Sequence, residues 1–168
     1  MAQAIALYNL GLTIYRALQV IATPGSSNAQ IAAAIATINT TTTAYQNTLS
    51  NMWNFLQPYF PHYNQRYVTA FQDWVGNGVT RIDTALAPVI MDGNAHGGVY
   101  SQAVLAAQAP DLMVCMGDLN AFRNPYNAQQ LEVPYYNAPG QALQLPEREE
   151  ILPGDFDPDT IGLPTDTE

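Results

Sequence analysis

Lysine is absent from this chain of 168 residues, and its permanent cations are Arg16, Arg66, Arg81, Arg123 and Arg148. Charged residues make up 11% of the sequence, whereas roughly 25% is typical of soluble domains. Free monomers rely on surface charge to resist association. We therefore expect a subunit whose surfaces are largely covered by its neighbours.

Acidic residues are absent from the first 72 positions, which carry only Arg16 and Arg66. Residues 73–146 hold six acids and two arginines, and residues 147–168 hold eight acids and one arginine, so the net charge of −9 is concentrated near the C-terminus. Buried helices are one interpretation of the acid-free segment, because charges are costly inside a protein. Its many Asn, Gln and Thr residues favour a second interpretation, a surface that faces a polyanion.

Cysteine occurs once, as Cys115, which excludes an intrachain disulfide. With His62 and His96 as the two histidines, a standard zinc site would also need carboxylates. Asp92 and His96 have the four-residue spacing of metal ligands on a helix, but the glycines around them predict a turn. Cys115 lies in an apolar run typical of a buried, inert thiol. We expect neither a metal nor a cofactor.

The signatures of common catalytic sites are missing: the sequence has no Gly-x-Ser-x-Gly elbow, phosphate-binding loop or dinucleotide fingerprint. Asp155, Asp157 and Asp159 alternate as in a calcium loop, but Thr160 and Asp166 stand where that loop needs Gly and Glu. An acidic, solvated tail is the better interpretation, and we do not expect an enzyme.

Residues 2–22 predict a helix that is apolar on almost all sides, which is typical of a helix buried against several partners. Its main apolar stripe consists of Leu7, Leu10, Ile14, Leu18 and Ile21. A narrow polar stripe remains, formed by Asn9, Thr13, Arg16 and Gln19. Because these polar residues interrupt the apolar run, we expect no transmembrane segment.

Residues 28–56 predict a long second helix, because apolar residues alternate at spacings of four and three and so share one stripe. The stripe consists of Ile31, Ile35, Ile38, Thr42, Tyr45, Leu49, Met52 and Leu56. Five of the six positions 38–43 are β-branched, which lowers helix propensity. The stripe nevertheless keeps its phase through them. Pro58 and Pro61 then end the helix within an aromatic cluster.

The next helices are expected to be shorter. We predict a third helix over residues 63–75 and a turn at Gly76-Asn77-Gly78. A fourth helix is expected over residues 79–91 and a fifth over residues 99–109. Residues 110–123 are ambiguous between strand and helix. The fold class is mainly α, a helical bundle of four to five helices over residues 1–123.

Seven of the twelve prolines fall in residues 124–168, which excludes regular helix there. Apolar residues recur through the same segment, unlike in a purely solubilising tail. We predict an extended, acidic C-terminal arm that docks on its own bundle or on a neighbouring subunit.

The apolar N-terminal helix (residues 2–22), the long second helix (residues 28–57), the abundant Tyr, Asn, Gln and Thr, and the arm (residues 124–168) together resemble the coat subunits of filamentous viruses of hyperthermophilic archaea. The resemblance implies paired subunits whose helices wrap duplex DNA and which assemble into a helical virion. We accordingly expect a structural protein of the virion. Its partners would be further copies or a related second subunit, and double-stranded DNA.

Two sets of contact residues follow from this hypothesis. Nucleic acid is expected to meet Asn9, Thr13, Arg16, Gln19 and Arg66. Subunit contacts are expected at Ile31, Ile35, Ile38, Tyr45, Leu49, Leu56, Leu145, Leu152, Phe156 and Leu163. The alternative is a cytoplasmic adaptor, a binding module whose long helical seam receives a partner helix.

Overall fold

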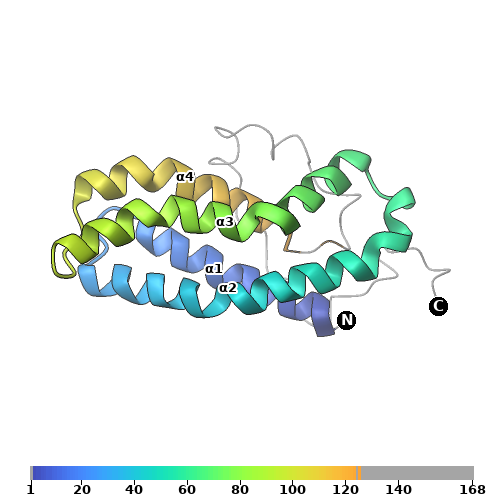
Figure 1. Ribbon diagram of the computed structural model, residues 1–168, viewed down its shortest axis with the longest axis horizontal. Coiled ribbons are helices and arrows are strands. Elements are labelled where there is room, and N and C mark those ends of the chain that lie inside the picture. Colours follow the sequence, from blue (N-terminus) through green and yellow to red (C-terminus); the bar gives the residue numbers. More distant parts are fainter. Residues whose placement is uncertain (1, 124, 126–168) are drawn as a thin grey trace.

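The computed structural model describes residues 2–123 and 125, and all regular secondary structure in this part of the chain is helical. Its elements are α1 (Ala2–Ala22), α2 (Asn28–Leu56), the 3-10 helix η1 (Gln57–His62), α3 (Gln65–Ala95) and α4 (Gln102–Ala121). The four α-helices alternate in direction and form an up-down-up-down bundle (Figure 1). The predicted mainly α fold is confirmed, whereas the predicted arm lies outside the described residues.

Helix α1 packs against both α2 and α4. Leu7, Ile14 and Leu18 are completely buried, as its predicted apolar stripe requires. By length and composition the stretch Gln3–Ala22 would also suit a membrane span, and it is the one helix of the described chain that does. However, 56% of its most apolar part is buried within the bundle, which is the environment of a core helix.

Helix α2 runs unbroken through its threonine-rich middle. Ser27 caps its start in a reciprocal capping box: the Gln30 N–H donates to Ser27 Oγ (3.1 Å), and the Ser27 N–H donates to Gln30 Oε1 (2.8 Å). Thr41 donates its hydroxyl to the carbonyl of Thr37 (2.6 Å), so this side chain is satisfied without disturbing the helix. Seven of the eight predicted stripe residues are buried, and Thr42 is half-buried.

Helix α3 is one helix of 31 residues, so the predicted turn at Gly76-Asn77-Gly78 is wrong. None of these residues has positive φ, the property for which turns select glycine. Gly78 instead makes room for an aromatic ring: a Cβ placed there would lie 2.6 Å from the indole of Trp74. Burial of that tryptophan therefore determines the conformation, and local turn propensity does not.

Helix α4 extends through Pro110 to Ala121, so the predicted fifth helix is too short and the ambiguous segment after it is mostly helical. Pro88 in α3 and Pro110 in α4 each remove one backbone hydrogen bond from a helix. Pro110 is exposed, so the carbonyl that loses its partner can bind water. Leu105 and Leu112 flank it and stay buried, which holds the helix together across the proline.

After α3 the chain reverses direction in the loop that leads to α4. Gly97 and Gly98 adopt positive φ angles of 64° and 90°. Ser101 donates its N–H to Asp92 Oδ2 (2.7 Å), and Tyr100 donates its N–H to Asn28 Oδ1 (3.0 Å). The second bond ties this loop to the first residue of α2. The turn predicted around Asp92 and His96 is confirmed at residues 96–98 and is wrong at Asp92, because α3 continues to Ala95.

The opposite end of the bundle is built from aromatic rings. The end of α2, η1 and the start of α3 form an arch (residues 52–71) that projects beyond the end of α4 (Figure 1). Trp53 packs on Phe60 with ring centroids 4.7 Å apart and edge-on against Phe71 at 5.7 Å. Phe122, just after α4, stacks on Phe71 at 5.6 Å. These contacts confirm the predicted aromatic cluster and join the arch to the bundle.

One buried hydrogen bond at the centre of the bundle offers a stability test. Trp74 donates its indole N–H to Tyr45 Oη (2.8 Å), and both side chains are completely buried. Tyr45→Phe leaves that N–H without its acceptor, and we expect the free energy of unfolding in urea to fall by about 1–3 kcal/mol.

The double variant Tyr45→Phe/Trp74→Phe separates this bond from general packing. Each single substitution removes the same bond, so the double variant should lose less stability than the sum of the two single losses. Additive losses would contradict a coupling between the two side chains.

Candidate functional site

The polar stripe of α1 lies on the surface as the sequence predicts. Asn9, Thr13, Arg16 and Gln19 are all exposed, while the residues between them face the core. Thr13 donates its hydroxyl to the carbonyl of Asn9 (2.9 Å), so its hydrogen is directed along the helix. Asn9 and Gln19 add amide groups to this exposed stripe, and Arg16 adds a guanidinium group.

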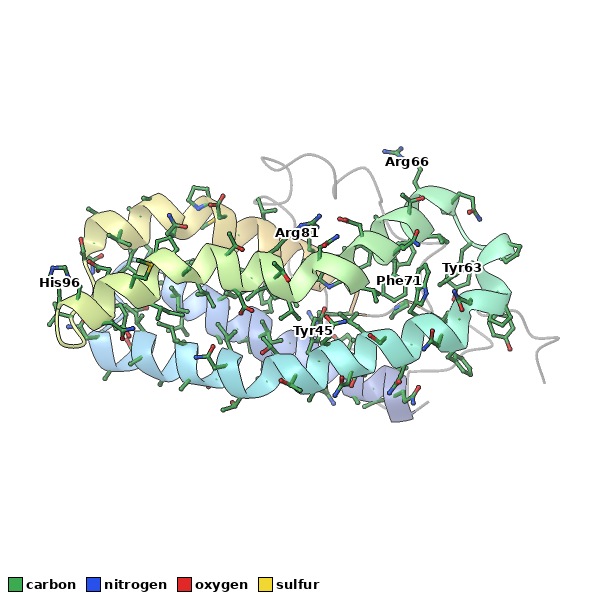
Figure 2. The ribbon with its side chains drawn as sticks, in the orientation of Figure 1. Tyr45, Tyr63, Arg66, Phe71, Arg81 and His96 are labelled. Atoms are coloured by element: carbon green, nitrogen blue, oxygen red, sulfur yellow. The ribbon has the colours of Figure 1, made fainter. Side chains whose placement is uncertain are left out.

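Arg66 does not belong to this stripe. It lies in the first turn of α3, where its backbone N–H donates to Asn64 Oδ1 (2.9 Å) and its side chain is exposed. Figure 2 shows its side chain pointing outward from the arch, well separated from α1 and at the opposite end of the bundle from His96. The structure thus brings together four of the five predicted nucleic-acid contacts and leaves the fifth apart.

The outer face of α2 adds a second uncharged surface beside α1. Helix α2 contains no Asp, Glu, Lys, Arg or His, and its one ionisable side chain, Tyr45, is completely buried. The exposed residues of α2 are Asn28, Ala29, Gln30, Ala32, Ala33, Ala36, Asn39, Thr40, Thr43, Ala44, Asn47, Asn51, Asn54 and Phe55. The sequence analysis assigned these residues to no contact surface, although they lie in the acid-free segment that indicates an uncharged surface.

The six predicted subunit contacts on α2 are core residues. Ile31, Ile38, Tyr45, Leu49 and Leu56 are at most 1% exposed, and Ile35 is 8% exposed. Helix α1 of the same chain packs on this helix, so the seam is filled from within and is closed to a neighbour. The prediction that these six side chains contact another subunit is therefore wrong. The other four, Leu145, Leu152, Phe156 and Leu163, lie outside the described residues.

The same packing bears on the adaptor alternative. An adaptor of that kind needs an open apolar seam along α2, and α1 already fills it. A partner helix would have to displace α1 and expose its apolar sides. The described part of the chain therefore offers no observation in favour of that alternative.

A buried carboxyl group lies where α4 faces α3. Asp118 is 4% exposed, and this burial raises its pKa from 3.8 to about 7, with the charge of Asp73 adding to the effect and that of Arg81 opposing it. Arg81 donates from Nη2 to Asp73 Oδ2 in a half-exposed ion pair on α3 (Figure 2 labels Arg81). The α3–α4 side of the bundle is thus the charged side.

Cys115 shares this environment. It is 4% exposed, and burial raises the pKa of its thiol to about 12, so the nucleophilic thiolate does not form near neutral pH. His96 cannot act on it, because Cys115 lies 13 residues along α4 from Gln102, about 20 Å from the loop that holds His96. The expectation of a buried thiol is confirmed.

Metal ligands do not converge in the described residues, where no three His, Cys, Asp or Glu side chains form a cluster. The Asp92–His96 pair has a structural role instead. Asp92 Oδ1 lies 3.1 Å from His96 Nδ1 and its Oδ2 accepts from the Ser101 N–H, so both oxygens hold the α3–α4 loop. The calcium-like acidic spacing from Asp155 to Asp166 lies outside the described part.

Comparison with protein-family models, curated proteins and solved structures gives no match to this chain. The molecule's function is therefore inferred from its own surface and charge distribution.

Asp118 gives the bundle a pH-dependent stability. Its pKa is higher in the folded chain than in the unfolded one, so this carboxyl contributes its full stability below about pH 4 and loses it as the pH rises through about 7. Asp118→Asn removes the cost of ionisation. We expect the variant to be more stable than the parent at pH 8, by up to about 4 kcal/mol, and nearly equal to it at pH 4.

The measurement is the midpoint of urea unfolding at both pH values. Asp83→Asn, an exposed carboxylate on α3, is the matched control and should change little at either pH. A stability difference for Asp118→Asn that is the same at pH 4 and pH 8 would contradict ionisation of a buried carboxyl.

Proposed function

We propose that this chain is a self-assembling structural protein, a coat subunit that forms a helical filament around nucleic acid. One observation carries the proposal: α1 and α2 pack side by side, and their exposed residues carry almost no charge. Neighbours in the filament would be further copies of the chain or a close relative. The protein would accordingly be located in a virion.

The chemistry of the α2 face supports contacts between subunits. Charged groups are depleted at the cores of protein interfaces, because burying them costs desolvation energy. An exposed helix face of alanine, threonine and asparagine avoids that cost and lets another surface approach closely. A free monomer gains nothing from such a face, since without charge it is prone to association.

The charge distribution supports nucleic acid on the α1 side. Its exposed stripe has one cation and three neutral polar groups, and no described residue before Asp73 is acidic. The exposed carboxylates Asp83 and Asp111 belong to α3 and α4. Phosphates along α1 would therefore meet hydrogen-bond donors without facing a carboxylate on α1 or α2. Because one arginine releases few counterions, affinity would depend on many copies along the polymer.

The C-terminal segment completes the proposal. Leu145, Leu152, Phe156 and Leu163 would be the anchors with which it latches neighbouring subunits together. The α2 seam, filled by α1, is no longer part of this subunit interface.

Assembly can be tested by placing a charge on the α2 face. Ala36→Glu keeps helix propensity but introduces a carboxylate that would be desolvated between copies. We expect the wild-type protein to form filaments or large oligomers, and the variant to need at least tenfold more protein for assembly, by sedimentation velocity and electron microscopy.

Ala107→Glu on α4 is the matched control, because it makes the same change at an exposed alanine on the charged side of the bundle. It should assemble like the wild type. A wild-type protein that stays monomeric at high concentration would refute the proposed function.

Nucleic-acid contact has a separate test. Arg16→Gln should weaken binding to duplex DNA uniformly across sequences, and should lower the slope of log affinity against log salt by about one per subunit in contact. Arg66→Gln removes the same charge far from α1 and should leave the slope unchanged. Equal effects of the two variants, measured by fluorescence anisotropy at several salt concentrations, would argue against a binding face along α1.

A further inference from the structure

The arch at the end of the bundle presents an aromatic surface that the bundle does not cover. Phe55 is 47% exposed, and its ring packs on Tyr59 with centroids 6.1 Å apart. The neighbouring rings Trp53 and Phe60 pack on each other. Tyr63 and Phe71 are buried and lie inside the arch (Figure 2). Phe55 and Tyr59 thus form the outer, accessible edge of a rigid aromatic cluster, which suits a docking surface better than an isolated apolar side chain does.

The charge of the arch indicates what kind of partner it suits. Residues 52–71 contain no acid, and their basic residues are His62 and Arg66. Arg66 is exposed and points outward from the arch (Figure 2). An acidic peptide with apolar anchors would match both features of this surface.

The chain itself supplies such a peptide. Residues 126–168 carry nine acidic residues and one arginine. The same segment contains apolar residues, including Tyr135, Ile151 and Phe156. The composition therefore complements the arch in both charge and hydrophobicity.

We propose that the arch of one copy is the docking surface for residues 126–168 of a neighbouring copy. This inference rests on the proposed function and names the two surfaces that the latch joins. Each copy has one arch and one acidic segment, so successive copies can join head-to-tail into an open filament, which is the arrangement that the proposed function needs.

The length of the segment allows it to reach a neighbouring copy. Phe122 and Arg123 are buried in their own bundle, with the Arg123 guanidinium 4.2 Å from the ring centroid of Tyr8. The 43 residues from 126 to 168 span up to about 140 Å when extended, while α2 is about 44 Å long. The segment is thus long enough to extend past its own bundle to the arch of an adjacent copy.

A photo-crosslinking experiment on the full chain tests the contact directly. Phe55 is replaced by benzoyl-phenylalanine, and ¹⁴N- and ¹⁵N-labelled copies are mixed before assembly and irradiation. We expect crosslinked peptides that join the arch to residues 126–168, with about half of them combining the two labels. Single-label crosslinks alone would show that the segment folds back on its own arch, and would overturn the proposal.

Two matched substitutions provide a second readout. Phe55→Glu places a carboxylate where the acidic segment docks, and should raise the protein concentration needed for assembly at least tenfold. Met91→Glu changes a 69% exposed side chain at the other end of α3 and should shift it less than twofold. Circular dichroism confirms that both variants retain the helical fold.

The outcomes separate this inference from the proposed function. If filaments form normally with Phe55→Glu, or if no crosslink reaches residues 126–168, the docking surface is wrong while the coat hypothesis stands. If the wild-type protein forms no assembly at all, both fail together.

Discussion

The apolar contact between α1 and α2 is the interaction on which the rest of the molecule depends. Burial of apolar surface is the main favourable term in folding, and Leu7, Ile14 and Leu18 of α1 are among the most deeply buried side chains. Because α1 also packs on α4, it holds together helices that are far apart in the sequence. Its few outward positions are consequently the ones left for polar residues. The exposed stripe is thus a by-product of how completely the helix is buried.

This arrangement divides the bundle into two chemically different sides. Helices α1 and α2 bring almost no charge to the surface, whereas α3 and α4 carry the described carboxylates and the Arg81–Asp73 ion pair. Asp118 lies beneath that second side, where burial keeps its pKa high. In the proposed coat subunit, the neutral side would serve close packing and polyanion contact, and the charged side would face solvent.

Periodicity predicted the first two helices almost to the residue, because their stripes are long and regular. The later helices were harder, because Gly76, Gly78, Pro88 and Pro110 are local signals that tertiary packing overrides. The ring of Trp74 packs against the backbone of Gly78, where a Cβ atom would collide with it. Trp74 is only one helical turn from Gly78, but its burial against Tyr45 and Phe122 is visible only in the folded chain.

Candidate sites were predictable to a smaller degree. The spacing of Asn9, Thr13, Arg16 and Gln19 placed them together correctly, since they share one helix. Arg66 was grouped with them on charge alone, and charge carries no information on distance. The α2 seam was correctly predicted to be apolar, but the helix that covers it was wrongly assigned to another subunit. An apolar stripe does not indicate whether the covering helix belongs to the same chain or to another.

The absence of titratable groups on the outside of α2 has a kinetic consequence. Oppositely charged surfaces attract one another over about 10 Å at ordinary ionic strength and accelerate encounter. Two faces of alanine, threonine and asparagine exert no such pull. Copies that meet through these faces would associate slowly, and the association rate would depend little on salt concentration. Hydrophobic contacts are stronger at higher temperature than in the cold. Protein concentration and temperature would therefore determine how fast the polymer grows.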